Sequence, residues 1–283
     1  MNKKIRLALN NYNPIPPSLL EPPFENISRG ELEVDLAKLY HHYYFDNYET
    51  TPPSPDPTCF EHVRFLMPSE SFRFLGKSLG SSTNARRSKS TELGQAFCRW
   101  FLHEHLEIIY FAHISEILDR QEARNIANCK VERIAAGDAP DYLCAKNASS
   151  IYLGEAKGRY TPISFTSQEF QGWRNQFSRV RVLNSRGIPR SVKGHIVATR
   201  FATESDSPKI QSKIFAEDPE TEGEGPPNEG EFGSLASAVI GLHYSRIAQK
   251  LNQPLLAAAL WNGTRLPDEI LVNAIVWKLD IDQ

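Results

Sequence analysis

The chain has 283 residues, of which 40% are hydrophobic and 23% charged, a composition typical of a globular protein with one large core. Its longest unbroken apolar run, residues 255–261, is far shorter than the roughly 20 residues of a membrane-spanning helix, which excludes an ordinary membrane protein. The first residues are basic but lack the apolar stretch of a secretory signal, and the four cysteines form no C-x-x-C pair. We therefore expect free thiols and a cytoplasmic protein without a membrane partner.

The net charge of −2 is unevenly distributed along the chain. Residues 217–231 hold seven acidic and no basic side chains, a charge of −7. The rest of the chain therefore carries a net charge of +5. The acidic stretch is rich in glycine and proline, which predicts a flexible loop. A mildly basic remainder is compatible with a polyanionic partner.

The N-terminal region, residues 1–85, is rich in proline and contains an aromatic cluster at 41–48. The aromatic residues favour burial over disorder. We expect an N-terminal extension or accessory lobe over 1–85, with a short amphipathic helix at 30–45, and a larger domain over 86–283.

The central part alternates between helical and strand-like patterns. Apolar residues at helical spacing predict a long helix over 91–118. Three strand-like runs follow, and then the Thr166-x-x-Glu169 spacing of a capping box opens a further helix. The predicted strands are 129–135, 140–146 and 150–157, and the second helix, 167–183, is followed by a strand at 192–202.

The C-terminal part continues the same core. Residues 212–218 are either a fifth strand or the start of the acidic loop, and 234–252 have a clear helical pattern. The apolar runs 255–261 and 270–281 are predicted as strands. The order of elements indicates an α/β fold, a sheet with helices on its faces.

Charged residues stand inside the apolar hairpin 140–157. Pro140-Asp141 opens its first strand, and Glu155-Ala156-Lys157 ends the second. Side chains alternate along a strand, so Glu155 and Lys157 share one face while Ala156 points to the other. Pairing of the two strands brings Asp141 beside Glu155, where two carboxylates repel each other unless they share a cation. Carboxylate oxygens are the ligands that Mg²⁺ prefers.

This pattern resembles the PD-(D/E)XK motif of the restriction-endonuclease-like nuclease superfamily, over about residues 88–202. The resemblance implies a restriction-endonuclease-like core with a mixed central β-sheet flanked by helices. It implies that Asp141, Glu155, the Ala156 carbonyl and a helical glutamate bind Mg²⁺ or Mn²⁺, and that Lys157 assists the attacking water. Glu92 is the expected helical glutamate, with Glu104 and Glu107 as alternatives.

The helix at 167–183 departs from the Gln-x-x-x-Tyr pattern of many members, because no tyrosine stands four residues after Gln168, Gln171 or Gln176. Gln171 is the best candidate for a polar catalytic contact, and an exposed surface glutamine is the alternative. The basic residues near this helix form either a phosphate-binding track or an ordinary charged surface. The candidate nucleic-acid contacts are Arg159, Arg174, Arg179 and Arg181.

The expected function is therefore metal-dependent hydrolysis of nucleic acid, with DNA favoured over RNA and an endonuclease favoured over an exonuclease. The resemblance also suggests a prokaryotic defence or mobile-element effector that a regulatory protein controls, and many members act as homodimers. A toxin with the same chemistry is a further possibility. The main alternative is a non-catalytic subunit that uses the nuclease-like core for nucleic-acid binding or assembly.

Overall fold

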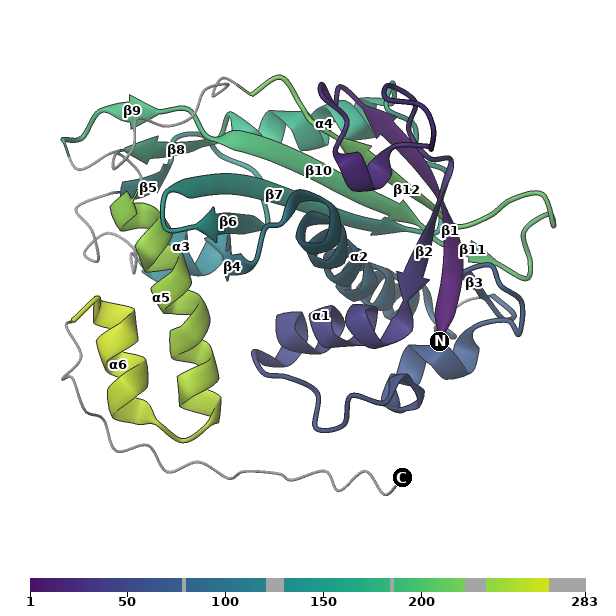
Figure 1. Cartoon of the computed structure of the whole chain (residues 1–283), viewed down its shortest axis with the longest axis horizontal. Coiled ribbons are helices and arrows are strands. Elements are labelled where there is room, and N and C mark those ends of the chain that lie inside the picture. The colour runs from purple at the N-terminus through teal and green to yellow at the C-terminus, as the bar shows by residue number, and fades with distance from the viewer. Residues whose placement is uncertain (78–79, 121–129, 184–185, 222–232, 265–283) are drawn as a thin grey trace.

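The structure is a computed structural model that describes residues 1–77, 80–120, 130–183, 186–221 and 233–264. Its architecture is α/β, with a seven-stranded mixed sheet between helices (Figure 1). The strands of this sheet, in chain order, are β1 (Asn2–Asn10), β2 (Glu31–Asp35), β4 (Tyr110–His113), β6 (Tyr142–Asn147), β7 (Ser150–Arg159), β10 (Lys193–Arg200) and β12 (Lys213–Glu217). The helices are α1 (Leu36–Tyr48), α2 (Thr83–Leu106), α3 (Ile114–Arg120), α4 (Gln168–Phe177), α5 (Gly233–Lys250) and α6 (Pro254–Asn262), with short 3₁₀ turns at Pro17–Leu19, Pro57–Cys59 and Glu61–Phe65.

The strand order across the sheet is β2-β1-β12-β10-β7-β6-β4. Strand β6 runs antiparallel to both of its neighbours, β4 and β7, whereas β10 runs parallel to β7. The described ranges hold five further strands outside this sheet. Strand β3 (Arg73–Phe74) pairs with β11 (Ala202–Thr203), and β5 (Lys130–Arg133), β8 (Val180–Leu183) and β9 (Pro189–Arg190) form a three-stranded sheet.

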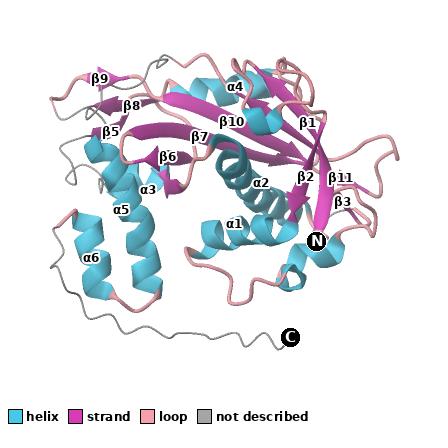
Figure 2. Cartoon of the chain, viewed as in Figure 1, coloured by secondary structure: helices cyan, strands magenta, loops and turns pink. Residues whose placement is uncertain are grey.

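Helices cover both faces of the central sheet (Figure 2). Leu93, Phe97 and Phe101 of α2 belong to one buried cluster together with Ala156 of β7. The other face packs against α4 and α5 in a second cluster, to which Leu153 of β7 belongs. The alternation along β7 therefore divides its side chains between two separate cores.

The N-terminal residues are built into the sheet. Strand β1 pairs with β12 in parallel and with β2 in antiparallel orientation. Ile5 of β1 and Phe97 of α2 lie in the same buried cluster. The boundary that the sequence suggested after residue 85 does not divide this core, because residues 1–85 complete one end of the sheet.

Several predicted elements are corrected by the structure. The helix expected over 91–118 ends at Leu106, where Glu107 takes a left-handed conformation with φ of 58°, and strand β4 follows. The strand expected at 129–135 exists as β5, but it belongs to the small sheet and not to the central one. The helix expected over 167–183 ends at Phe177 and gives way to β8.

The ends of the chain differ from expectation as well. The helix expected at 30–45 divides into β2 and α1, and the strand expected at 255–261 is the helix α6. The predictions at 140–146, 150–157, 192–202 and 234–252 are confirmed within a few residues, and 212–218 is a strand, β12. The strand expected at 270–281 and most of the acidic stretch lie outside the described residues.

Two simpler expectations concern the thiols and the membrane. Cys59, Cys98 and Cys144 are free thiols, as predicted, and Cys129 lies outside the described residues. No helix in the described part of the chain has both the length and the apolar character needed to cross a membrane.

Candidate active site

Strand pairing between β6 and β7 brings Asp141 and Glu155 together. Tyr142 pairs with Gly154, so the residues just beyond this pair, Asp141 and Glu155, lie side by side where β6 begins. The Asp141 Oδ2 atom accepts a hydrogen bond of 2.8 Å from the main-chain N–H of Ala156. In a strand the N–H and C=O of one residue point to the same neighbour, so the Ala156 carbonyl faces the side of Asp141 as well.

Lys157 completes this cluster. Its ammonium group forms an ion pair with Glu155 Oε1 and lies 3.7 Å from Asp141 Oδ2. Burial alone lowers the pKa of Lys157, but the charges of Glu155 and Asp141 outweigh that effect and raise it. Lys157 is therefore a cation at neutral pH, held between the carboxyl groups of Glu155 and Asp141.

Glu155 is the most deeply buried member of the cluster, with no exposed surface. Its Oε2 atom has no hydrogen-bond partner among the described residues. Burial, and next the negative charge of Asp141, raise the pKa of this carboxyl group well above its usual range. Glu155 thus carries a cost in stability that a further bound cation would offset.

A pocket of about 320 Å³ opens at this cluster. Asp141 and Lys157 line it, together with residues of α2, α3, α4, β4, β5 and the loop 137–140. Among these, Gln95 of α2 and Gln176 of α4 supply amides, and His113 of β4 supplies an imidazole. Gln176 is buried, and its Oε1 atom has no hydrogen-bond partner among the described residues.

Glu92 and Gln171, both expected at the site, are placed elsewhere. Glu92 accepts hydrogen bonds from Tyr43 Oη at 3.1 Å and Ser88 Oγ at 2.9 Å, and the pocket lining does not include it. Helix α2 covers the sheet face to which Ala156 points, whereas Glu155 and Lys157 point to the other face. Gln171 bonds Asn175 and Arg174 on the surface of α4, away from the pocket.

The alternatives to Glu92 do not line the pocket either. Glu104 pairs with Lys38 at 2.6 Å, and Glu107 forms an ion pair with Lys146. Two helix glutamines that do line the pocket, Gln95 of α2 and Gln176 of α4, were not predicted as site residues. Gln95 lies three residues after Glu92, about one turn away on nearly the same side of α2, so the helical period alone does not show which of the two lines the pocket.

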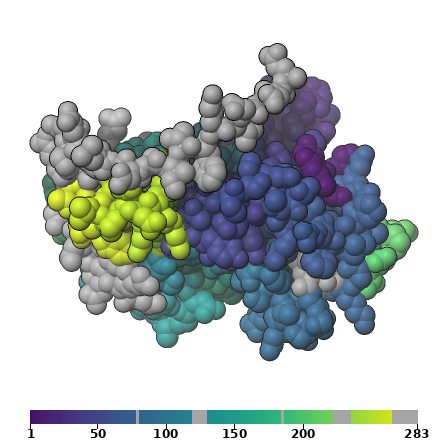
Figure 3. All heavy atoms as spheres, turned by 90° about the horizontal axis from the view of Figure 1, so that it is seen from below, coloured from purple at the N-terminus to yellow at the C-terminus, as the bar shows by residue number. Residues whose placement is uncertain are grey.

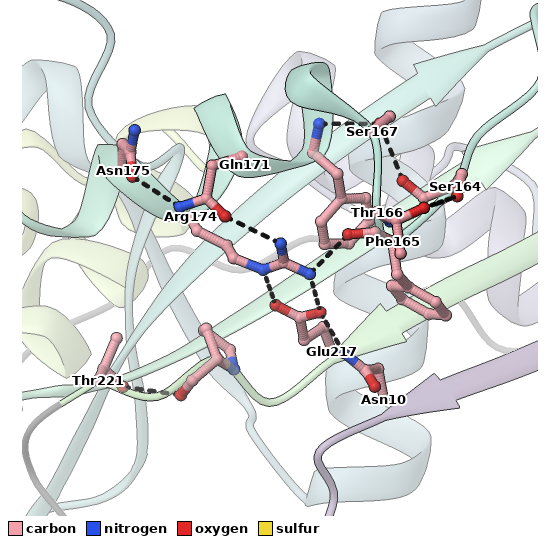
Figure 4. A network of polar contacts seen from close by, with 12 residues as sticks. Asn10, Ser164, Phe165, Thr166, Ser167, Gln171, Arg174, Asn175, Glu217 and Thr221 are labelled. Atoms are coloured by element: carbon pink, nitrogen blue, oxygen red, sulfur yellow. Dashed lines mark hydrogen bonds and ion pairs between the residues drawn. The ribbon is translucent and has the colours of Figure 1, made fainter.

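Each of the four arginines expected to contact nucleic acid already has a protein partner. Arg159 pairs with Glu169 at 3.0 Å, Arg181 pairs with Glu132, and Arg179 donates to the Asp138 carbonyl at 2.9 Å. Arg174 is the most constrained of them. It binds both oxygens of the fully buried Glu217, at 2.6 and 2.7 Å, and also the Phe165 carbonyl (Figure 4).

The donor set suits a hard cation with few protein ligands. Among the described residues no three His, Cys, Asp or Glu side chains are arranged to hold a metal ion together. Asp141, Glu155 and the Ala156 carbonyl provide two carboxylates and one carbonyl. Mg²⁺ is commonly bound by only one or two carboxylates, with water and substrate phosphates as its other ligands. The unpartnered Oε2 atom of the buried Glu155 fits such a role.

Comparisons with protein-family models, with curated proteins and with solved structures found no match for this chain. The case for a function therefore depends on the geometry of the site and on the resemblance of its motif.

Proposed function

We propose that this protein is a metal-dependent phosphodiesterase that hydrolyses nucleic acid, with DNA the favoured substrate. The observation that carries this proposal is the meeting of Asp141, Glu155 and Lys157 at the edge of one pocket. A buried carboxyl group is costly, and the ion pair with Lys157 offsets only part of that cost for Glu155, whose pKa stays raised.

The topology around the cluster supports the proposal. Helix α2, the antiparallel strands β4, β6 and β7, helix α4 and the parallel strand β10 follow one another in the chain. This is the arrangement that the PD-(D/E)XK resemblance implies, with Asp141 preceding one strand and Glu155-Ala156-Lys157 near the end of its partner. The order was expected from the sequence, although the first of the three strands is β4 and not β5.

In the proposed reaction the cation and the protein side chains have different roles. Mg²⁺ or Mn²⁺, when bound, supplies positive charge to the phosphate and acidity to a bound water. Asp141, Glu155 and the Ala156 carbonyl would hold it. The Lys157 ammonium stabilises the negative charge that develops on the phosphate in the transition state and orients the attacking water. Gln95 and Gln176 offer amide groups to a substrate in the pocket.

Part of the small sheet lies beside the pocket and offers a surface for the substrate. Arg133 of β5 lines the pocket and donates to the Gly137 carbonyl, and Arg179 donates to the Asp138 carbonyl. Both arginines hold the loop that leads to Asp141. Arginine side chains at such a position are suited to contact phosphates of a bound strand.

The test is a nicking assay with supercoiled plasmid and Mg²⁺ or Mn²⁺. Wild-type protein should nick or linearise the plasmid, and EDTA, Lys157→Ala and Asp141→Asn should each abolish this activity. Lys146→Ala is a matched control, because Lys146 lies on the same hairpin and forms an ion pair with Glu107 outside the pocket. Activity in all variants would point to a contaminating nuclease.

Calorimetric titration with Mn²⁺ separates an inert enzyme from a protein without a metal site. Binding to the wild type that is lost in Asp141→Asn would support the site even if no cleavage is seen, and would direct attention to a missing regulatory partner. The absence of both binding and cleavage would contradict the proposal.

One observation favours the non-catalytic alternative, a subunit for assembly. The α5–α6 hairpin exposes two large apolar side chains, Leu251 and Leu255, which suit contact with another protein. Such a surface is also compatible with a nuclease that a partner regulates or that forms a homodimer. The metal titration distinguishes these cases, since an assembly subunit needs no cation at Asp141 and Glu155.

A further inference from the structure

A second pocket, lined by both apolar and basic side chains, lies where α1, α2 and α5 meet, outside the candidate active site. It has a volume of about 240 Å³. The yellow C-terminal helices lie next to the blue α1 region when the molecule is viewed from below (Figure 3). The side chains that matter for the argument are Lys38 and His42 of α1, Arg99, His103 and Glu104 of α2, and His243 of α5.

Arg99 is the unusual member of this pocket. Its side chain is only 5% exposed, and its guanidinium group stacks at 4.5 Å over the Phe111 ring. One hydrogen bond of 3.2 Å joins it to Asp46, while its buried Nε atom has no partner among the described residues. A guanidinium group has five N–H donors. A buried arginine that makes so few hydrogen bonds can therefore still donate to a bound anion.

The imidazole groups around Arg99 add hydrogen-bonding capacity without much charge. Burial, and next the charge of Arg99, lower the pKa of His42 well below its usual range and that of His243 to about 4. Neutral imidazoles are also metal ligands, but no three His, Cys, Asp or Glu side chains in the described ranges are arranged around a common metal position. They therefore act here as hydrogen-bonding groups.

We propose that this pocket binds a phosphate group, either free phosphate or the phosphate of a small ester, and that its occupancy is coupled through Asp46 to the candidate active site. Arg99 of α2, Lys38 of α1 and the imidazoles of α1 and α5 offer hydrogen-bond donors from three helices, and a phosphate group can accept from several of them at once. Lys38, which is half exposed, also lines the pocket, where it forms a 2.6 Å ion pair with Glu104. A phosphate bound to Lys38 would replace the Glu104 carboxylate as its partner.

Asp46 provides the physical link between the two pockets. One of its oxygens, Oδ1, contacts Arg99 at 3.2 Å, Tyr142 Oη at 2.7 Å and His113 Nε2 at 3.4 Å. His113 lines the candidate active-site pocket, and Tyr142 directly follows Asp141. An anion that bonds to Arg99 weakens the bond between Arg99 and Asp46. Asp46 then contacts only His113 and Tyr142, and this change alters the wall of the candidate active-site pocket that His113 forms. Phosphate binding and the coupling to His113 do not depend on the proposed nuclease activity. Only an effect of phosphate on cleavage rests on that proposed function.

Binding is tested on the full chain by calorimetry and thermal melting with sodium phosphate, against sodium chloride at equal ionic strength. Phosphate should bind with one-to-one stoichiometry and raise the melting temperature, and Lys38→Ala should weaken binding about tenfold, as the loss of a charge-assisted bond predicts. Lys4→Ala is the matched control, because Lys4 is also half exposed and also forms a 2.6 Å ion pair with a glutamate. A phosphate monoester such as adenosine monophosphate, used in parallel, shows which source of phosphate binds more tightly.

Three results would overturn the binding proposal. They are no effect of phosphate beyond that of chloride, equal weakening by Lys38→Ala and Lys4→Ala, and loss of binding in Lys157→Ala, which would place the anion in the other pocket. Lys38 is exposed, so its substitution leaves the fold intact, whereas a change at the buried Arg99 risks unfolding.

Coupling is tested through the imidazole NMR signals of protein labelled with ¹⁵N-histidine, with His113 assigned from the His113→Gln variant. Saturating phosphate should shift the His113 signal in the wild type, and Asp46→Asn should reduce that shift. An unmoved His113 signal in phosphate-bound protein would overturn the coupling. This readout needs neither metal nor cleavage, so it remains decisive if the nuclease proposal fails.

Discussion

Gly158 of β7 lies against the main-chain carbonyl of Ser90 of α2, so closely that a Cβ atom on Gly158 would overlap that oxygen. Gly94, one turn further along α2, meets the main chain of Lys157 and Gly158 in the same way. The two glycines allow α2 to approach the strand that carries Glu155 and Lys157 at backbone distance.

Substitution of Gly158 by alanine is expected to lower the free energy of unfolding by about 3 kcal/mol or more, because a rigid backbone contact must open. The control is Gly172→Ala in α4, where a Cβ would meet no atom within 4 Å. That change is expected to raise stability by about 0.5–1 kcal/mol, since alanine favours a helix. Urea denaturation measures both, and equal stability of the two variants would contradict the close packing.

The sequence predicted the hairpin that carries the site better than it predicted the surroundings. Alternation and turn residues were enough to place Asp141 beside Glu155, because strand pairing is regular. The end of α2 and the strand β4 were missed, since residues 106–113 are apolar at almost every position and fit either structure. Pairing of β4 with β6, a tertiary contact, decides the outcome.

One of the wrong predictions of secondary structure could have been corrected from the sequence itself. Helix α6 begins with Pro254 at its first position and ends before Gly263, the usual residues at those places, and alanine and leucine favour helices. By contrast, no local signal distinguishes Gln95 and Gln176, which face the pocket, from Glu92 and Gln171, which do not. Their placement depends on how each helix is rotated against the sheet.

Replacement of Glu155 by glutamine is expected to stabilise the metal-free protein while it abolishes Mn²⁺ binding. The pKa of Glu155 is raised in the folded state, so the folded protein binds more protons than the unfolded chain at neutral pH, and its stability falls as the pH rises above about 4.3, the ordinary pKa of the group. Glutamine removes that penalty, worth about 1.4 kcal/mol for each unit of pKa shift.

Denaturation at pH 7.5 without metal tests this expectation, and Glu107→Gln, an exposed substitution, should leave the midpoint unchanged. A less stable Glu155→Gln variant would mean that the ion pair with Lys157 outweighs the cost of burial.

Acid is expected to destabilise the fold through buried histidines, most clearly His195 of β10. Burial, and next the charge of Lys193, lower the pKa of His195 to about 3, against about 6.5 in an unfolded chain. The unfolded state therefore binds more protons between these values, and stability falls as the pH drops below 6.5, by up to about 1.4 kcal/mol per unit.

His195 lies between the rings of Tyr12 and Tyr152, so phenylalanine can take its place as a flat ring that does not titrate. The His195→Phe variant should lose less stability between pH 6.5 and pH 4 than the wild type in denaturation experiments. Parallel pH profiles of the two proteins would assign the acid sensitivity to other groups.

Arg174 is expected to support the fold and not to bind phosphate, because it binds both oxygens of the buried Glu217 and carries the positive charge that neutralises it (Figure 4). Arg174→Ala should cost about 3–5 kcal/mol by leaving a buried charge unpaired. Arg181→Ala, at an exposed pair with Glu132, should cost at most about 1 kcal/mol. Thermal melting compares the two variants, and a small loss in Arg174→Ala would return this arginine to the candidate nucleic-acid contacts.

The pairing of β1 with β12 has a consequence for how the molecule is made. Asn10 and Glu217, hydrogen-bonded across these strands, are 207 residues apart in the chain. At a ribosomal rate of roughly 5–20 residues per second, β1 waits on the order of ten seconds or more for its partner. During that interval the unpaired edge of β1 is available to other chains, whereas β6 and β7, joined by a short turn, can pair at once. The hairpin that carries the candidate catalytic residues can thus form well before the sheet around it is closed.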